Sequence, residues 1–393
     1  MSNRLQQVAS HVLPSSYTAN KAGYKSPEDV VIVSALRTAI TRARKGPFQS
    51  TLPEEMLAPV FKAIIQKTGI DPKLVEDITV GNVLPQGGGA TNARMAALYA
   101  GFPETTAVST LNRQSGILEI GIGAGVESMT LNYGASSLAP TSERIADNCE
   151  SAADCLIPMG ITSENVAADF QVSREKQDAF AAESHRKADI AQKNGWFQEE
   201  IVPVEAIVTD EEGNEKVVLA DRDDGIRPGT TAEKLSKLRP AFDDDGTTTA
   251  GNASQVSDGA AAVLLMKRKT AQKLKLANLG QIHYLCCCWC SSRIMGVGPA
   301  YAIPVALQRA GLTVDQVDIF EINEAFASQA LGIPAEKVNP KGGAIAFGHP
   351  LGCTGARQIA TLLPELKRQG KKIGVTSMCI GSGMGMSAVF ESE

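Results

Sequence analysis

The sequence has 393 residues, enough for two or three domains with hydrophobic cores of their own. Its net charge of −5 excludes the strongly basic surface of a nucleic-acid-binding protein, and no run of 18 apolar residues predicts a membrane span. The N-terminus lacks a secretory pattern, and cysteines outside one dense cluster are too sparse for a disulfide framework. We therefore expect an intracellular protein of a reducing compartment.

Strand and helix patterns alternate through the first third of the chain. Asp29–Arg37 predicts a buried strand, and Thr51 with Glu54 predicts a capping box that opens a helix through Lys67. Next come a strand (DITVGNVL), a glycine-rich loop at 87–89, a helix from 91 and two strands (VSTLN and EIGIGAGV). This alternation predicts an α/β sandwich with mostly parallel sheets.

The middle of the chain is more polar and contains helical patterns such as SREKQDAFAAESHRKADIAQK. The stretches 314–325 and 372–385 then repeat the outline of the first half, although generic α/β patterning would explain such weak echoes as well. The predicted division is a leader (1–28), an N-terminal half (29–127), an inserted loop lobe (128–245), and the completed core with a C-terminal half (246–393).

A histidine in GGAIAFGHPLGCTGAR, residues 342–357, is the first candidate for chemistry. His349 lies between Gly348 and Pro350, after an apolar run that we expect to be a strand and before a predicted helix. Glycine lets the backbone approach a ligand closely, and Pro350 fixes the turn. A single histidine is most often structural, but this setting favours a functional side chain.

Two further stretches carry candidate groups. Cys379, in SMCIGSGMG, ends a predicted strand and precedes Gly381 and two more glycines, whose backbone N–H groups could stabilise an oxyanion. A buried, inert thiol is the alternative for a single cysteine. Asn323 and Glu324, in EINEAF, follow a predicted strand, where their side chains either face a site or cap a helix.

Cysteine, histidine and asparagine beside glycine-rich loops suggest acyl transfer through a thioester. A metal site is disfavoured because His349 and Cys379 have no closely spaced ligand residues. A nucleotide-binding oxidoreductase is not indicated either, since no GxGxxG follows the first predicted strand.

These motifs resemble those of a known family. NEAFA, GGAIAFGHPLGCTGAR and SMCIGSGMG are similar to the signature motifs of the thiolases. CLIPMGITSENVA and TTAGNASQVSDGAA are similar to the degradative, peroxisomal 3-ketoacyl-CoA branch of that family. The resemblance runs from Asp29 to Phe390 and implies a two-halved, layered α/β/α/β/α sandwich with an inserted loop lobe.

The resemblance also implies a reaction, in which CoA cleaves a 3-ketoacyl-CoA into acetyl-CoA and a shortened acyl-CoA. In the family a nucleophilic cysteine takes the acyl group, and the GHP histidine, matched by His349, activates that cysteine. Cys379 matches a second cysteine that moves protons, and Asn323 matches the asparagine that holds an oxyanion-hole water. The backbone of Gly381 matches one donor of the other oxyanion hole. Two such sites are needed because a thioester carbonyl develops negative charge in both half-reactions.

Substrates and partners follow from the same resemblance. CoA and acyl-CoA are expected as substrates, with no permanently bound cofactor, and the protein is expected to form a homodimer. The positions that match CoA-binding residues are Met159, Arg227, Ala250, Ser254 and Phe326.

The N-terminal segment is similar to the N-terminal type of peroxisomal targeting signal. Arg4 and Leu5 are followed, after five residues, by His11, although Val12 stands where that signal prefers leucine or alanine. A frayed amphipathic helix is the alternative. A targeting signal would imply the peroxisomal import receptor as a partner and the peroxisome matrix as the location.

The chain departs from the family where the nucleophile belongs. Thiolases continue NRQ with C-S-S-G and a helix, whereas here Gln114 runs directly into Ser115. By this comparison a helix of roughly 16 residues, about 24 Å long, is missing, and a second gap of about two helical turns follows Ala330. Cys379 is disfavoured as a replacement nucleophile, because its family role needs a separate acyl-bearing cysteine opposite it.

The stretch YLCCCWCSSR, residues 284–293, holds four of the eight cysteines. A zinc site needs converging ligands, which three adjacent cysteines do not readily provide. Family members have a segment like F-A-A-V-G-V-P-P before IMGVGPA. If each codon of such a segment ends in T, a reading frame that starts at the third base of the phenylalanine codon translates as CCCWCSS. We therefore interpret Cys286–Ser292 as an out-of-frame translation, with the frame restored by Ile294, rather than as a metal or disulfide site.

Two hypotheses remain for this chain. In the first, the gene encodes a working 3-ketoacyl-CoA thiolase of which this sequence is a faulty reading, since His349, Cys379 and Asn323 are all kept. In the second, the chain as printed is a non-catalytic protein that binds CoA or pairs with an intact thiolase subunit.

Overall fold

The computed structural model describes residues 22–111, 119–134, 137, 140–210, 212–324 and 332–393. The targeting-signal segment therefore lies outside the described residues. The strands are β1 (Val30–Thr38), β2 (Thr41–Arg42), β3 (Asp77–Gly81), β4 (Ala107–Leu111), β5 (Ile120–Ser128), β6 (Ile201–Val202), β7 (Val204–Thr209), β8 (Glu215–Ala220), β9 (Ser257–Lys267), β10 (Gly280–Trp289), β11 (Ile319–Ile322), β12 (Ile373–Ile380) and β13 (Met384–Ser392).

The helices differ widely in length. The longer ones are α2 (Pro53–Thr68), α3 (Ala90–Ala100), α6 (Met159–Phe170), α7 (Arg174–Lys193), α10 (Gly298–Ala310) and α13 (Thr354–Gln369). The shorter ones are α4 (Glu143–Asn148), α5 (Glu150–Ala153), α8 (Ala232–Ser236), α9 (Arg268–Lys273) and α12 (Ala344–Phe347). Among the described residues, no helix is both long enough and apolar enough to cross a bilayer.

The main sheet consists of two halves joined by one short ladder. Its strand order is β11-β12-β13-β10-β1-β9-β5-β3-β4, with β2 paired to β9 and β6 to β1. The strands β1 and β10 share only two residue pairs, Val31 with Gln281 and Ile32 with Gly280. The neighbouring ladders β5–β9 and β10–β13 are much longer. The join therefore separates an N-terminal half, which ends at β4, from a C-terminal half, which ends at β11.

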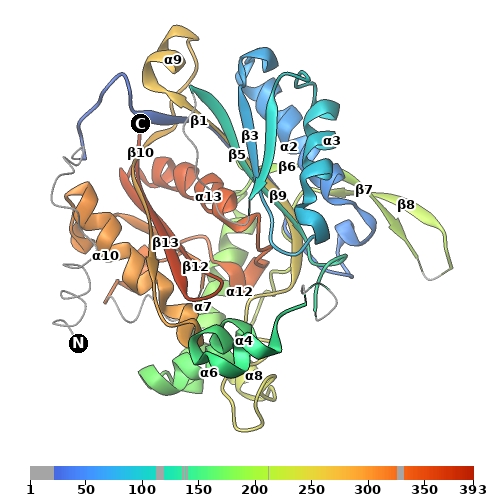
Figure 1. The fold of residues 1–393 in the computed structure, drawn as a ribbon, viewed down its shortest axis with the longest axis vertical. Coiled ribbons are helices and arrows are strands. Elements are labelled where there is room, and N and C mark those ends of the chain that lie inside the picture. Colours follow the sequence, from blue (N-terminus) through green and yellow to red (C-terminus); the bar gives the residue numbers. More distant parts are fainter. Residues whose placement is uncertain (1–21, 112–118, 135–136, 138–139, 211, 325–331) are drawn as a thin grey trace.

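Helices cover both outer faces and fill the space between the halves (Figure 1). The pair α2 and α3 packs on the N-terminal half, and α10 packs on the C-terminal half. Helix α13 contacts β1, β5 and β9 on one side and β11, β12 and β13 on the other. The layered α/β/α/β/α arrangement that the family resemblance implied is confirmed.

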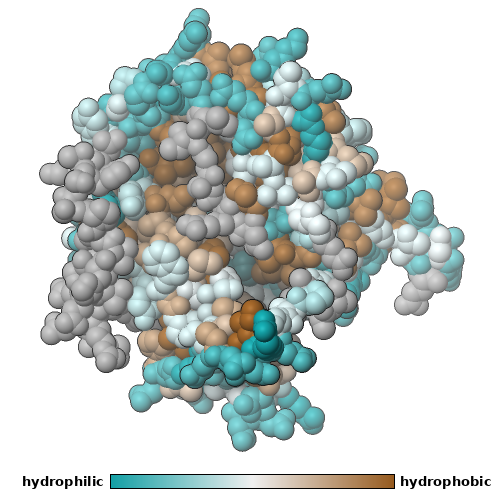
Figure 2. Space-filling model, in the orientation of Figure 1, coloured by the Kyte–Doolittle hydropathy of each residue, from teal (hydrophilic) through white to brown (hydrophobic). Residues whose placement is uncertain are grey.

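The polar middle segment leaves the sheet at Ser128 and returns at Ser257. Its two ends lie side by side, because Ser128 is opposite Asp258 in the antiparallel ladder of β5 and β9. The segment also supplies β6 to the main sheet and forms a separate hairpin from β7 and β8. This hairpin projects from the body and exposes the apolar side chains of Ile207, Val217 and Leu219 (Figures 1 and 2).

The prediction of mostly parallel sheets is wrong, because most strand pairs of the main sheet are antiparallel and the parallel ones are β1–β6, β3–β4, β3–β5 and β11–β12.

Two local predictions are also wrong. Helix α2 begins after Leu52, whose backbone N–H donates to the Glu55 carboxylate at 2.8 Å, because Pro53 suits the first helical position. Thr51 and Glu54 therefore do not form the capping box. The apolar run before His349 is the short helix α12 and not a strand, and Gly348 ends it with a φ of 110°. A run of four apolar residues does not by itself distinguish the two structures.

The cysteine-rich stretch forms the end of β10. Cys288 lies opposite Gly385 in β13, is 6% exposed and packs against α10, whereas the next residue, Trp289, is 66% exposed. All eight cysteines are free, and among the described residues no group of three or more possible ligands could hold a metal ion. In this fold residues 284–289 of the stretch belong to a strand, whose period of two places the small thiols of Cys286 and Cys288 against the core.

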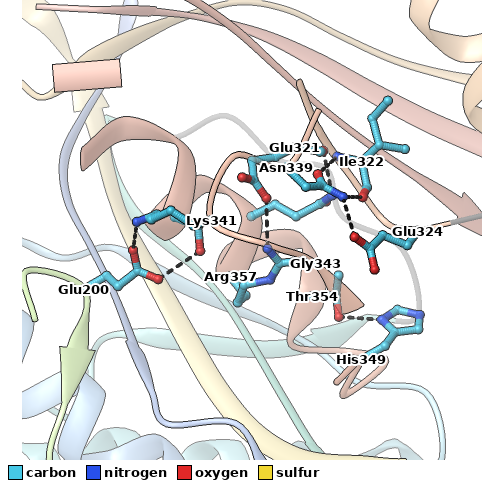
Figure 3. A network of polar contacts seen from close by, with 12 residues as sticks. Glu200, Glu321, Ile322, Glu324, Asn339, Lys341, Gly343, His349, Thr354 and Arg357 are labelled. Atoms are coloured by element: carbon cyan, nitrogen blue, oxygen red, sulfur yellow. Dashed lines mark hydrogen bonds and ion pairs between the residues drawn. The ribbon is translucent and has the colours of Figure 1, made fainter. Parts of the chain in front are cut away.

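A buried cluster of charges ties β1 to the middle segment and to the C-terminal half. The Arg37 guanidinium donates to Glu200 at 2.7 Å and to Asp223 at 2.7 and 2.9 Å. Lys341 donates to Glu200 at 2.5 Å (Figure 3). All four side chains are at most 1% exposed. Each carboxylate therefore depends on a cation for the charge compensation that water provides elsewhere.

We predict that Arg37→Met lowers the free energy of unfolding by about 3–5 kcal/mol, because the buried Asp223 loses its cation and the buried Glu200 loses one of two. Urea denaturation followed by circular dichroism measures this change. The matched control is Lys237→Ala, which breaks an exposed ion pair with Glu233 and should cost less than about 1 kcal/mol. Equal losses in the two variants would contradict the prediction.

Candidate active site

The ends of β11 and β12 bring the first two candidate residues together. These strands are parallel neighbours, with Ile322 opposite Ser377, so their carboxyl ends meet at one edge of the sheet. Asn323 follows β11 directly, and its backbone N–H donates to the Ser377 carbonyl at 2.8 Å. Cys379 lies two residues further along β12. Asn323 follows a strand and Cys379 lies near the end of one, as the sequence predicted.

His349 is held in the turn between α12 and α13. Its Nε2 lies 3.2 Å from the amide nitrogen of Asn323, which is 5% exposed. Its Nδ1 lies 2.6 Å from the Thr354 hydroxyl at the start of α13 (Figure 3). Asn323 and His349 are 26 residues apart in sequence, and His349 and Cys379 are 30 apart. Their motifs converge because α13 crosses between the two halves of the sheet.

Burial pushes the two titrating groups of the site in opposite directions. It lowers the pKa of His349 to about 4, with a further contribution from the positive charge of Arg357. It raises the pKa of Cys379 to about 11, although a contact with the Asn323 side chain favours the thiolate. Both groups are therefore neutral at pH 7, so that the imidazole can accept a proton and the thiol can give one.

Gly381 lies in the turn between β12 and β13. It is exposed, and nothing lies within 4 Å of the position that a Cβ would take. A carbonyl oxygen can therefore approach this backbone without a steric barrier, as an oxyanion donor requires.

Close backbone contacts fix the loop after His349 against the N-terminal half. A Cβ on Gly352 would lie 2.4 Å from the Cα of Asn82, and one on Gly125 would lie 2.0 Å from the carbonyl oxygen of Gly352. The Glu127 carboxylate accepts the N–H of Gly352 at 2.9 Å and two N–H groups of the loop after β3 at 3.0 and 3.1 Å. The sequence analysis missed Glu127; its only signal was an acidic residue at the end of an otherwise apolar strand.

Glu324 acts as an anchor inside the fold. Its buried carboxylate accepts hydrogen bonds from Ser184 in α7 at 2.8 and 2.9 Å, from Asn339 at 3.1 Å and from the N–H of Ile345 in α12 at 2.8 Å (Figure 3). Burial raises the pKa of this carboxyl group, and these donors oppose that rise. The side chain thereby joins α7 and α12, which places the turn that carries His349.

The candidate CoA-binding residues lie on exposed segments. Met159 begins α6, and Arg227, Ala250 and Ser254 lie in loops of the segment between β5 and β9, while Phe326 lies outside the described residues. The backbone N–H of Arg227 donates to Nδ1 of His185 in α7 at 3.2 Å.

Family models match almost the whole chain. The N-terminal domain of thiolase matches residues 30–269, and the C-terminal domain of thiolase matches residues 276–392. The chain belongs to the thiolase family.

Full-length relatives support the same assignment. The chain is 54% identical to the peroxisomal 3-ketoacyl-CoA thiolase of Yarrowia lipolytica over 391 positions, which cover 94% of each chain. It is 52% identical to the peroxisomal 3-ketoacyl-CoA thiolase B of Rattus norvegicus over 421 positions, which cover 99% of each. Its fold matches the crystal structure of the dimeric peroxisomal thiolase of Saccharomyces cerevisiae with a TM-score of 0.86 and 48% identity, over 94% of this chain and 99% of that one. It also matches human mitochondrial 3-ketoacyl-CoA thiolase in complex with CoA, with a TM-score of 0.80 and 31% identity, over 93% and 98% of the two chains.

This thiolase lacks residues that a relative in the family has. The alignment with the rat relative spans 421 positions, 28 more than the 393 residues of this chain, so the relative has at least 28 positions without a counterpart here. The sequence predicts shortened segments after Gln114 and after Ala330, and both junctions lie outside the described residues. The first of them is where the family carries its acyl-accepting cysteine.

We predict that alkylation of Cys379 by iodoacetamide accelerates about tenfold per pH unit up to about pH 11, since only the thiolate reacts. Asn323→Leu should slow the reaction at every pH below 11, because loss of the amide contact raises the pKa of the thiol further. Peptide mass spectrometry measures both rates, with the fully buried Cys353 of the same chain as an internal reference for unfolding. A rate that levels off below pH 9 would show that Cys379 is held as a thiolate instead.

Proposed function

We propose that this thiolase cleaves 3-ketoacyl-CoA with CoA, as an acetyl-CoA C-acyltransferase of fatty-acid β-oxidation in the peroxisome. One observation carries the proposal: His349, Asn323 and Cys379 meet on the three motif loops, in a chain about half identical over its length to peroxisomal 3-ketoacyl-CoA thiolases. CoA and acyl-CoA are its substrates.

The assigned roles follow from the protonation states. In the first half-reaction the neutral imidazole of His349 takes the proton of the attacking thiol, whose sulfur bonds to the substrate's 3-keto carbon. The bond between that carbon and the α-carbon breaks, and the Cys379 thiol protonates the departing carbanion to give acetyl-CoA. In the second, incoming CoA transfers its thiol proton to the Cys379 thiolate and takes the acyl group, and the His349 imidazolium returns its proton to the departing thiolate. The Gly381 N–H stabilises the negative oxygen in the acyl-transfer steps.

A second candidate function is favoured by one observation. The residue after the NRQ triplet is Ser115, where the family has its acyl-accepting cysteine. A chain without that cysteine would bind CoA thioesters, or pair with an intact thiolase subunit, without forming the acyl-enzyme.

Tryptic mapping of the endogenous protein separates the two functions. Cleavage after Arg113 should release a peptide that starts at Gln114, and its next residues identify the junction. A peptide that begins Q-C-S-S-G, together with thiolysis activity that is lost when the gene is deleted, is the result we expect from the catalytic function. A peptide that reads QSGILEIG and ends at Arg144, with no dependence of thiolysis on the gene, would establish the non-catalytic alternative.

The chain also has a surface suited to a homodimer. Strand β4 is the outer strand of the N-terminal half, so one of its edges has no neighbour within the described sheet. Helix α3, which packs beside β4, exposes Met95, Leu98 and Tyr99. We infer that a second copy covers this edge, and sedimentation equilibrium of the purified chain measures it. The N-terminal segment, with Arg4 and His11, remains the predicted ligand of the import receptor.

We predict that the purified chain binds CoA and that Arg227→Ala weakens the affinity about tenfold, through loss of one charge-assisted contact to a phosphate group. Isothermal titration calorimetry with CoA measures the dissociation constant. The matched control is Arg222→Ala, an exposed arginine of the same segment, which should leave the affinity within about twofold. Equal effects of the two substitutions would remove Arg227 from the site.

A further inference from the structure

The His349 ring is held at both nitrogens, which leaves open which nitrogen carries the single proton of the neutral form. On one side stands the Thr354 hydroxyl, 2.6 Å from Nδ1, and on the other the Asn323 amide, 3.2 Å from Nε2. The hydrogen bonds of these two partners decide the tautomer, because a neutral imidazole has one donor and one acceptor nitrogen.

The hydroxyl group of Thr354 has a single proton, and the hydrogen bond to Pro350 uses that proton. The Thr354 hydroxyl lies 3.0 Å from the carbonyl oxygen of Pro350, one helical turn earlier. A carbonyl oxygen can only accept, so Thr354 donates there and offers a lone pair to Nδ1. The short contact at Nδ1 is therefore an N–H of His349 that donates to Thr354.

The contact with Asn323 on the other side fits the same tautomer. The nitrogen of the Asn323 amide, which is a donor, faces Nε2, so Nε2 is the acceptor. The Asn323 side chain also contacts the Cys379 thiol, which places Nε2 on the side of the reacting groups.

We propose that Thr354 is a positioning residue that holds the proton of His349 on Nδ1 and thereby keeps Nε2 as the catalytic base. This inference rests on the proposed function, in which His349 takes a proton from a thiol, and it adds the group that makes one nitrogen available for that step. Thr354 is fully buried, and its hydroxyl bonds His349 and Pro350. It acts through the imidazole, as the partner of a catalytic histidine does wherever a hydrogen bond at one ring nitrogen sets the state of the other.

A purely structural role would explain only part of this geometry. Threonine at the start of a helix commonly bonds a carbonyl four residues earlier, and the Pro350 contact alone fits that habit. A helix-capping role does not account for the 2.6 Å contact between the Thr354 hydroxyl and Nδ1 of His349. The test must therefore follow the imidazole proton and not only the stability of the fold.

The experiment uses the full chain labelled with ¹⁵N-histidine, whose four histidines give four imidazole spin systems. Long-range ¹H–¹⁵N spectra at pH 7 distinguish the two tautomers, and His349→Asn identifies the signal of that residue. We expect the unmodified chain and Thr354→Ser to carry the proton on Nδ1, whereas Thr354→Val shifts it wholly or partly to Nε2. The matched control is Thr361→Val, which removes another buried hydroxyl of α13 that bonds Glu200 and not His349.

Either of two results would overturn the proposal: a folded Thr354→Val chain that keeps the proton on Nδ1, or an unmodified chain with the proton on Nε2. If Thr354→Val does not fold, as judged by circular dichroism, the smaller Thr354→Ala replaces it in the same comparison. Where thiolysis is measurable, Thr354→Val should lower kcat about tenfold or more with KM within about twofold, and serine should restore it. Absence of thiolysis in the unmodified chain would count against the proposed function, while the spectra would still decide the tautomer.

Discussion

The burial of α13 between the two halves of the sheet is the constraint on which the site depends. A helix in this position must find partners for its polar side chains away from water. Thr354 meets His349, the Gln358 amide donates to carbonyls in β11 and β12 at 2.8 and 2.9 Å, and Thr361 donates to Glu200 at 3.0 Å. These bonds fix the rotation and register of α13, and with them the turn that carries His349 and the strand ends that carry the other catalytic candidates.

The same burial determines the electrostatics of the site. His349 is kept neutral by desolvation and by the nearby Arg357, whose guanidinium is bonded to the buried Glu321 at 3.1 Å (Figure 3). Desolvation of Glu321 raises its pKa to about 7, which marks this ion pair as closely balanced. Cys379 stays protonated for the same reason that His349 stays unprotonated. An enclosed site disfavours charge of either sign, so the proton transfers start from neutral groups.

The cysteine-rich stretch and the shortened junction after Gln114 have different consequences for the fold. Cys286 and Cys288 occupy inward positions of β10 beside α10, where a small side chain of almost any kind would fit the alternation of the strand. The out-of-frame interpretation therefore does not conflict with a folded strand. The junction instead lacks the cysteine that accepts the acyl group in the family, which is why the identity of the residue after Gln114 decides between the two proposed functions.

Local pattern was sufficient for most elements and for the identity of the catalytic candidates. Apolar runs and alternation predicted β1, β3, β5 and α7, and glycine-rich junctions drew attention to His349 and Cys379 because such backbone is needed where a ligand approaches. The tertiary structure alone decided that residues 344–347 form a helix, that Glu324 anchors α7 and α12, and that Glu127 clamps the loop after His349. It alone also decided the partner at each nitrogen of His349. These outcomes depend on contacts between segments far apart in the chain, and a sequence pattern carries no information about which distant group will occupy the space beside a side chain.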